Sequence, residues 1–454
     1  MPITQLKQQP ISVTRQMAAA LPKLAAIAKA KGLELHHLGA GYPHPEVTNP
    51  MGYIAHKDAY FEHLAGQEPL QKVLQPLYSY TDTLGPASTR EMFAKIYGHD
   101  FNTRLDPELL IPTIGSSGGI SQMCSLFERS GEKVAYITDA PTYAGFISRA
   151  NLYQKARIYS VEMDLEGPSC EALAAQITQA RADGYTVAFY YTVPDGHNPG
   201  GISFSEQRRR DVIEVLRAHD TLLVEDAPYS YISFETANKR PKPFFALAPE
   251  QTVHLFTASK IGLPGPRIGF MYTEAKIELA NKQTVPLNQL LLTEASANIL
   301  LHNPEALRGF EAFLTDEKFS ARQSLWPIAN EKNQIYSENR QILLDTFEQE
   351  FARHKDMFHW TKPGAGFFSV FTINHPNVIC NSDLTDKLVA EYGVVTIPTF
   401  SFYPEDARAR NSKAGLDQLR LSFCYSEGIG ERRRQQLQAA ASAFAEAIKQ
   451  ECGV

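Results

Sequence analysis

The central part of the chain carries short apolar runs that are separated by segments of helical length. These runs occupy residues 109–115, 133–139, 186–193, 221–226, 252–258 and 267–273. Each is as long as a strand and rich in β-branched and aromatic side chains, which predicts strands. The third, fourth and fifth runs have few polar positions, which is typical of strands covered by helices on both faces. We therefore expect a mostly parallel α/β sheet that binds ligands at the carboxyl ends of its strands.

Helical and loop patterns flank this region. Residues 17–31 are rich in Ala, Leu and Lys and stop at Gly32, which predicts a helix. Glycine and proline predict a loop over residues 38–45. A long helical pattern covers residues 315–351 but contains Pro327. Because proline in a helix interior removes a hydrogen bond and kinks or breaks the helix, we place a domain change near Pro327.

Beyond that proline, the pattern predicts a small α+β domain. Strand-like runs and helical segments alternate over residues 364–373, 382–392, 394–398, 418–424 and 428–449. A chain of 454 residues is too long for one compact core. We therefore predict an N-terminal segment that packs with the small domain (1–50), a large domain (51–325) and the small C-terminal domain (326–454).

Composition excludes several classes of function. The chain has 43% hydrophobic and 21% charged residues, as an ordinary globular protein does, and its net charge of −6 provides no basic surface for nucleic acid. Five scattered cysteines without a CxxC pair favour a reducing cytoplasm, and the histidines lack the spacing of a metal site. Residues 1–5 do not begin a signal peptide, and no apolar run is long enough to span a membrane. We expect a cytoplasmic protein that has no metal and binds neither nucleic acid nor membrane.

Small and polar residues follow the predicted strands. Gly115-Ser116-Ser117 opens a helix whose N-terminus can bind phosphate, although small residues also form plain tight turns. This stretch matches neither the P-loop nor the GxGxxG pattern. Asn198 lies in a turn after the third strand, and Asp226 and Tyr229 lie at the end of the fourth. A carboxylate there needs a partner if it is buried and none if it is solvated.

The stretch from residue 256 to 267 carries a lysine at the end of an apolar run. Partial desolvation of Lys260 would lower its pKa and make it a competent Schiff-base amine. Arg267 follows a turn rich in glycine and proline, where it could clamp a compact anion such as phosphate. For an isolated lysine, a surface position beside a turn is the commoner explanation.

The order of three motifs resembles that of the class I and II aminotransferases, pyridoxal-phosphate enzymes of fold type I. The motifs are Asn198-Pro199-Gly200, Asp226-x-x-Tyr229 and Ser259-Lys260 with the later Arg267. The resemblance runs over residues 33–445, and the stretch 259–267 is most similar to the valine–pyruvate type. It implies a mostly parallel seven-stranded sheet in the large domain, beside a smaller α+β domain.

The resemblance also implies a role for each candidate residue. Lys260 would bind pyridoxal 5'-phosphate as a Schiff base and shuttle a proton at the substrate α-carbon. Asp226 would pair with the ring nitrogen of the cofactor, Asn198 and Tyr229 with its ring oxygen, and Tyr143 would stack on the ring. The phosphate would be held by Ser116, Ser117, Thr257, Ser259 and Arg267. Tyr143 could also be a packed core residue, since aromatic side chains often fill cores.

Three further residues complete the implied site. Gly41 and Arg420 would bind the substrate carboxylate, although Arg420 could also be a surface arginine on an edge strand. Tyr80 would reach the phosphate in a neighbouring subunit, which makes the active unit a homodimer.

The expected activity is transfer of the α-amino group of an L-amino acid to a 2-oxo acid such as pyruvate or 2-oxoglutarate. Tyr42, Phe400 and Phe402 favour an apolar or aromatic substrate, although they could equally serve packing. Thr399 and the segment 53–80 depart from the family pattern, and we expect both near the substrate entrance. C–S or β-lyase, racemase and decarboxylase chemistry use the same residues and stay open. A non-catalytic effector-binding domain is disfavoured because no basic helix-turn-helix pattern precedes the sheet.

Overall fold

The computed structural model describes residues 12–129 and 131–454. Residues 1–5, in which no signal peptide was expected, lie outside the described residues, as does the start of the predicted N-terminal segment. Within the described part, no helix combines the length and the hydrophobicity needed to cross a bilayer.

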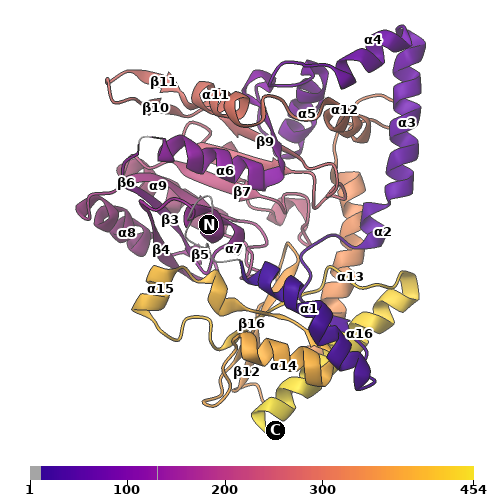
Figure 1. Cartoon of the computed structure of the whole chain (residues 1–454), viewed down its shortest axis with the longest axis vertical. Helices are drawn as coiled ribbons and strands as arrows, with labels where there is room; N and C mark the ends of the chain where they lie inside the picture. Colours follow the sequence, from indigo (N-terminus) through magenta and orange to yellow (C-terminus); the bar gives the residue numbers. More distant parts are fainter. Residues whose placement is uncertain (1–11, 130) are drawn as a thin grey trace, which may run out of the picture.

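An eight-stranded sheet forms the upper part of the molecule in Figure 1. Its strands, in spatial order, are β2 (Ile111–Ile114), β9 (Ile268–Thr273), β8 (Thr252–Thr257), β7 (Leu223–Ala227), β6 (Thr186–Thr192), β3 (Val134–Ala140), β4 (Ala156–Asp164) and β5 (Gly167–Pro168). The pairs from β8 through β4 are parallel, whereas β9 runs antiparallel to β8 and β2. All six predicted strands are present, so the mostly parallel sheet is confirmed. It has eight strands rather than seven because the two-residue β5 folds back on β4.

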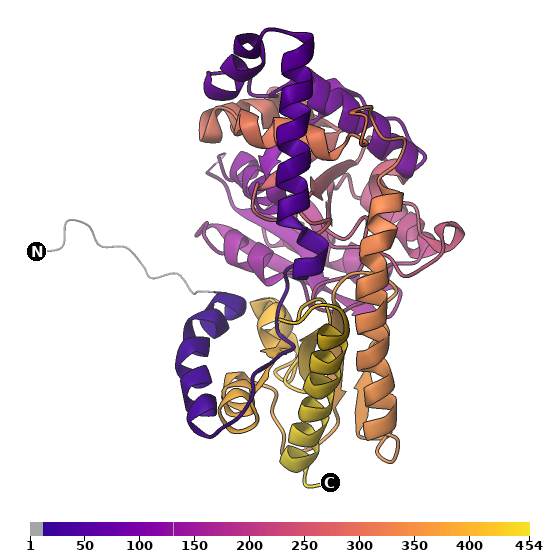
Figure 2. The same ribbon diagram turned by 90° about the vertical axis from the view of Figure 1, so that its right-hand side faces the viewer.

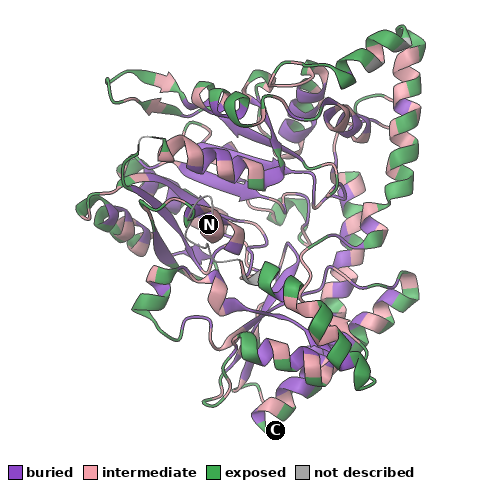
Figure 3. Ribbon diagram, in the orientation of Figure 1, coloured by how far each residue is buried: buried purple, intermediate pink, exposed green. Residues whose placement is uncertain are grey.

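Helices cover both faces of this sheet, as the apolar strands predicted. One face packs against α6 (Gly115–Glu128), α7 (Ala144–Ala150) and α11 (Leu287–Ile299). The other packs against α8 (Cys170–Ala182), α9 (Glu206–Ala218) and α10 (Phe244–Leu247), with α5 (Ala87–Asp100) and α12 (Pro304–Phe313) beside them. Figure 3 shows the strands as a buried layer between these helices.

A second, antiparallel sheet lies below the first. Its order is β12 (Phe358–Trp360), β13 (Phe368–Ile373), β16 (Gln418–Ser422) and β15 (Ile397–Pro398). It packs with α14 (Ser382–Tyr392), α16 (Gly430–Cys452) and the second half of α13 (Trp326–Glu350). The N-terminal helix α1 (Val13–Ala30) packs against α14, and β1 (His36–His37) pairs with β14 (Val394–Val395). The domain boundaries at residues 50 and 325 stay a prediction.

Pro327 begins a helix instead of interrupting one, which corrects the sequence interpretation. It lies in the first turn of α13, where the missing N–H of proline costs nothing, and the residues from 315 to 325 are not helical. In Figure 2, α13 runs from the first sheet down to the second. Ala329, near the start of α13, packs in a core shared with the eight-stranded sheet. Leu343 and Phe347, near its end, pack in the core of the four-stranded sheet.

The segment 53–80 lies away from the cleft between the two sheets. It forms most of α3 (Pro50–Gln67), then α4 (Leu70–Leu74) and the 3-10 turn η1 (Gln75–Tyr78), and packs on α12. Figure 3 shows α3 exposed along most of its length. The expectation that this segment lies near the substrate entrance of its own chain is therefore wrong.

The remaining short elements connect these parts. They are α2 (Pro45–Thr48), η2 (Pro107–Leu109), η3 (Ala237–Lys239), β10 (Lys276–Glu278), β11 (Thr284–Pro286), η4 (Thr399–Phe402) and α15 (Glu405–Arg410).

Candidate active site

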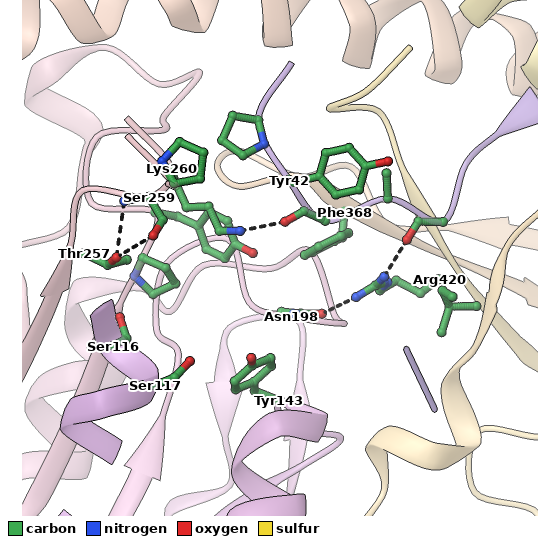
Figure 4. Close-up of a pocket in the computed structure, with 18 of the residues that line it drawn as sticks. Tyr42, Ser116, Ser117, Tyr143, Asn198, Thr257, Ser259, Lys260, Phe368 and Arg420 are labelled. Carbon is green, nitrogen blue, oxygen red and sulfur yellow. Dashed lines mark hydrogen bonds between the residues drawn. The ribbon is translucent and has the colours of Figure 1, made fainter. Parts of the chain in front are cut away.

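A cavity of about 590 Å³ opens where the carboxyl ends of the parallel strands face the second sheet. It is lined by every predicted site residue except Tyr80: Gly41, Ser116, Ser117, Tyr143, Asn198, Asp226, Tyr229, Thr257, Ser259, Lys260, Arg267 and Arg420. Figure 4 shows several of them converging from both sheets. The residues that follow separate strands are therefore brought to one place, as parallel strands require.

Lys260 follows β8 and extends across the cavity toward the loop that carries Tyr42 (Figure 4). Its Nζ donates a hydrogen bond to the carbonyl oxygen of Gly41 at 2.6 Å. Burial lowers the pKa of Lys260 to about 8. At pH 7 about a tenth of this amine is therefore uncharged, the form that nucleophilic attack on a carbonyl requires.

Asp226 ends β7 and is almost fully buried. Its Oδ2 accepts a hydrogen bond from the Tyr191 hydroxyl at 2.7 Å, whereas its buried Oδ1 has no hydrogen-bond partner among the described residues. Burial raises the pKa of Asp226 to about 6, so the carboxylate is mostly ionised at neutral pH. A protonated ring nitrogen would supply the partner that Oδ1 lacks.

A set of donors at one end of the cavity fits a phosphate group. Helix α6 starts at Gly115, directly after β2, and its first turn contains no acidic residue. Gly115 has a φ of +62°, and a Cβ there would lie 2.6 Å from Nη2 of Arg267. Arg267 donates from Nη1 to the Ser259 Oγ at 2.9 Å, and the buried Ser116 Oγ has no hydrogen-bond partner in the described part of the chain. A helix N-terminus, an arginine and a serine hydroxyl that is available as a donor are suited to binding a doubly charged anion.

Arg420 lies at the opposite side of the cavity, on a central strand of the second sheet. It donates from Nη1 to Asn198 Oδ1 at 3.0 Å and from Nη2 to the Gly39 carbonyl at 2.9 Å. Its guanidinium carbon lies 4.1 Å from the ring centroid of Phe368 and 5.2 Å from that of Phe402. Burial lowers the pKa of Arg420 to about 10, so it is still charged at neutral pH.

Arg420 is therefore a buried cation, and within residues 12–129 and 131–454 no carboxylate forms an ion pair with it. A buried charge without a counterion is costly, so the site favours an anion. The alternative that Arg420 is a surface arginine on an edge strand is wrong, because β16 lies between β13 and β15.

Tyr143 and Tyr229 line the middle of the cavity with aromatic surface. Tyr143 precedes α7, and Tyr229 lies in the turn after β7. Burial raises the pKa of both hydroxyls, so both are neutral hydrogen-bonding groups. Their positions are compatible with stacking on a flat ring and bonding its substituents.

Sequence reasoning missed several residues of the cavity. Phe368 lines the cavity next to Arg420. Tyr191 does not line it but donates a hydrogen bond to Asp226, which does. Met17 and Leu21 of α1 form part of the wall. No local motif marks these residues, because each reaches the site through the packing of distant segments.

Three expectations about the cavity need correction. Phe400 and Phe402 are absent from its lining. Tyr80, expected in a neighbouring subunit's site, is 88% exposed, and its role stays a prediction. Thr399 is fully buried, and its hydroxyl donates to the carbonyls of Gly415 and Gln418 at 3.1 and 2.9 Å, so it belongs to the packing of η4 rather than to an entrance. Tyr42 does line the cavity and is half-exposed.

The fold and the cavity together define an enzyme of the pyridoxal-phosphate class, with a cofactor site at the strand ends and an anion site opposite. The sequence pattern of the family Aminotransferase class I and II matches residues 56–422, and the chain belongs to this family. Its cofactor is pyridoxal 5'-phosphate, and the unpartnered atoms of Asp226 and Ser116 fit the ring nitrogen and the phosphate of that cofactor. The expected fold type, cofactor and enzyme class are thus confirmed.

Two relatives of known activity cover most of the chain. It is 26% identical to (S)-3,5-dihydroxyphenylglycine transaminase of Amycolatopsis orientalis, over 85% of this chain and 83% of that one. It is also 26% identical to aromatic-amino-acid aminotransferase 1 of Thermococcus litoralis, over 86% and 83% of the two chains. The fold is similar to that of the Pyrococcus horikoshii kynurenine aminotransferase in complex with PMP, with a TM-score of 0.74, 22% identity and coverage of 98% and 96%. The similarity to the valine–pyruvate type stays a prediction.

Proposed function

We propose that this aminotransferase moves the α-amino group of an apolar or aromatic L-amino acid to a 2-oxo acid such as pyruvate or 2-oxoglutarate. The observation that carries this proposal is the chemistry of the cavity wall beyond Arg420. That wall consists of Met17, Leu21, Tyr42, Val395 and Ile397. Apolar surface of this kind gains free energy by covering an apolar side chain.

The charged lining residues support the same substrate class. Lys260, Asp226 and Arg267 face the cofactor end, and Arg420 is needed for the α-carboxylate. Among the lining residues that the structure describes, His37 is the only other basic side chain. The side-chain carboxylate of an acidic amino acid therefore finds no fixed cation, whereas an aromatic side chain finds apolar surface. By the same argument pyruvate, which lacks a second carboxylate, is favoured over 2-oxoglutarate as the acceptor. The two relatives named for aromatic or hydroxyphenyl amino acids agree with this preference.

The site residues divide the chemistry between them. When bound, pyridoxal phosphate supplies the electron sink that stabilises negative charge at the substrate α-carbon. Lys260 holds the cofactor through its amine and then moves the proton at that carbon, for which its lowered pKa suits it. Asp226 keeps the ring nitrogen protonated, and Arg420 orients the substrate through its carboxylate.

The other residues position the cofactor. Asn198 and Tyr229 would donate to the ring oxygen, and Tyr143 would cover the ring. Ser116, Ser117, Thr257, Ser259 and Arg267 would hold the phosphate. The loop that contains Gly41 lines the same cavity, where it would border the carboxylate site.

The proposed active unit is a cytoplasmic homodimer. Tyr80 is exposed at the end of a projecting segment that also exposes Met51 and Tyr78, by 76% and 77%. Aromatic and apolar side chains exposed together are typical of a protein interface. In such a dimer Tyr80 would contact the phosphate in the partner's cavity. The cytoplasmic location rests on the five cysteines, all of which are free thiols.

A panel of amino acids added to the purified holoenzyme tests the proposed activity. An aromatic or large apolar amino acid should convert the cofactor to its amine form, and a 2-oxo acid should reverse the change. Lys260→Ala serves as the control and should not turn over. Release of ammonia and a 2-oxo acid without an acceptor would contradict transamination in favour of a lyase, and preference for aspartate would contradict the substrate class.

A further inference from the structure

Tyr191 is a buried tyrosine of β6 that none of the proposed roles uses. Its side chain is completely buried, and its hydroxyl donates to Oδ2 of Asp226 at 2.7 Å. The other oxygen of the same carboxylate, Oδ1, is the buried atom that lacks a partner among the described residues. The two oxygens of Asp226 are therefore distinguished: the protein binds one and leaves the other for the cofactor.

The ring of Tyr191 is held in place from a second direction. Phe146 of α7 stacks on it with a centroid distance of 4.0 Å and an interplanar angle of 9°. Phe146 is fully buried and follows Tyr143 by one helical turn. Phe146 therefore packs the helix that begins after Tyr143 against the tyrosine that bonds Asp226.

Neighbouring residues on β6 show that this contact depends on the face of the strand. Tyr190 points to the opposite face and bonds Asp139, whereas Tyr191 points to the face of Asp226. A double tyrosine in the sequence does not reveal which hydroxyl reaches the site. The pairing of Tyr191 with Val224 on β7 places its ring beside Asp226.

We propose that Tyr191 is a positioning residue for the reaction. Its hydroxyl fixes the Asp226 carboxylate so that Oδ1 faces the ring nitrogen of the cofactor, and it stabilises the ionised form of that carboxylate. This inference rests on the proposed role of Asp226.

The physical basis is the bond between a neutral donor and a charged acceptor. Burial raises the pKa of Tyr191 well above its ordinary value, so the phenol stays protonated and always donates. Burial raises the pKa of Asp226; the hydrogen bond from Tyr191 opposes that rise most, and the Ser116 hydroxyl, His254 and Lys260 oppose it less. Without the hydroxyl, Asp226 would be protonated at a higher pH, and the neutral carboxyl group could no longer stabilise a protonated ring nitrogen by accepting its hydrogen bond. The other ionisable groups around Asp226 are Tyr143 on α7, Tyr229 after β7, His254 on β8 and Lys260 after β8.

The test is the pH dependence of cofactor affinity in four variants of the cofactor-free protein. Tyr191→Phe removes only the hydroxyl, and Phe146→Leu loosens the stack. Tyr136→Phe is the matched control, because this buried tyrosine of β3 also donates to a carboxylate, Glu128 at 2.8 Å, away from the cavity. Asp226→Asn removes the titrating group. Binding of pyridoxal 5'-phosphate is followed by its fluorescence, and folding by circular dichroism.

In the wild type, affinity should fall as the pH drops through about 6, the pKa of Asp226. In Tyr191→Phe the midpoint of this fall in affinity should move up by about one pH unit. A hydrogen bond to a charged group stabilises the charged form enough to shift its pKa by about one unit. The wild type should bind pyridoxal 5'-phosphate up to about tenfold more tightly than Tyr191→Phe below pH 6, and this difference should decline at higher pH. Phe146→Leu should shift the midpoint in the same direction by less, and Tyr136→Phe should leave it unchanged.

Several results would overturn the inference. A Tyr191→Phe profile that coincides with the wild-type profile, or a weakening that is equal at all pH values, would show that Tyr191 has no role or only a structural role. The same holds if adding Tyr191→Phe to Asp226→Asn weakens binding as much as it does alone. If Asp226→Asn itself keeps the wild-type profile, the proposed role of Asp226 fails instead, and that outcome is distinct. A positioning role also predicts a lower kcat with little change in KM for the amino-acid half-reaction.

Discussion

In the cofactor-free protein, Lys260 should react with amine-directed reagents at a pH where surface lysines are nearly inert. Burial lowers its pKa from 10.5 to about 8. At pH 7 the uncharged fraction is then about 9%, against roughly 0.03% for an ordinary lysine, a ratio of about 300. A less basic amine is also a weaker nucleophile, and a Brønsted slope of about 0.5, as found for thiols, removes a factor of roughly 18. The uncharged fraction outweighs that loss, so Lys260 should react about 16-fold faster.

The assay is trace labelling with acetic anhydride over a pH range that includes 8 and 10.5, with each lysine quantified by peptide mass spectrometry. Lys282, whose side chain is 82% exposed and whose pKa is raised by the ion pair with Glu278, reports a surface amine that stays charged. Lys332 is the matched control, because burial also lowers its pKa to about 8 although it does not line the cavity. A midpoint for Lys260 that coincides with that of Lys282, while Lys332 titrates near 8, would refute the argument that the cavity desolvates Lys260.

The same shift has a consequence for stability. Because the folded pKa lies below the unfolded one, the buried charge destabilises the fold below pH 8, and this cost disappears above pH 10.5. The shift corresponds to about 3 kcal/mol, of which the hydrogen bond to Gly41 recovers about 1 kcal/mol. Lys260→Met should therefore raise the free energy of unfolding of the cofactor-free protein by about 2 kcal/mol at pH 7, measured by urea denaturation. A loss of stability in this variant would contradict the calculation.

Two further substitutions test the anion sites. Gly115→Ala adds a methyl group 2.6 Å from Nη2 of Arg267 at a φ of +62°, so affinity for the cofactor should fall by about tenfold or more. Gly184→Ala, at a φ of +78° with no atom within 4 Å, carries the same backbone strain and should bind the cofactor normally, as fluorescence titration would show. Phe368→Leu removes the ring 4.1 Å from the Arg420 guanidinium, which is worth about 1 kcal/mol, so KM for the amino acid should rise by about fivefold with little change in kcat. An unchanged KM would show that this ring does not hold the arginine.

The cofactor half of the site could be predicted from the sequence because its residues lie in turns directly after strands. Apolar runs locate the strands, and parallel strands bring the turns together, so Asn198, Asp226 and Lys260 converge without further information. Chain order then separates them from ordinary turn residues. The domain change placed at Pro327 arose because a proline in the first turn of a helix and a helix-breaking proline look alike in a sequence.

The substrate half could not be predicted in the same way. Phe368 and Met17 reach the cavity only because α1 and the second sheet pack against the strand ends. Thr399 lies close in sequence to Ile397, which lines the cavity, but its side chain points into the packing instead. A period of alternation fixes which residues share a face, but it does not fix which face meets the cofactor.

This division explains why membership of the family indicates the cofactor and the reaction class but not the amino-acid substrate. The cavity residues proposed to hold the cofactor lie at strand ends of one sheet, and the family match over residues 56–422 spans all of them. The amino-acid side chain is proposed to lie against Met17 and Leu21 of α1, and the family match begins only at residue 56. Substitutions in α1 can therefore change the shape of the wall without disturbing Lys260 or Asp226. Exchanges at Met17 should consequently alter the ratio of kcat/KM between two amino acids more than they alter cofactor affinity.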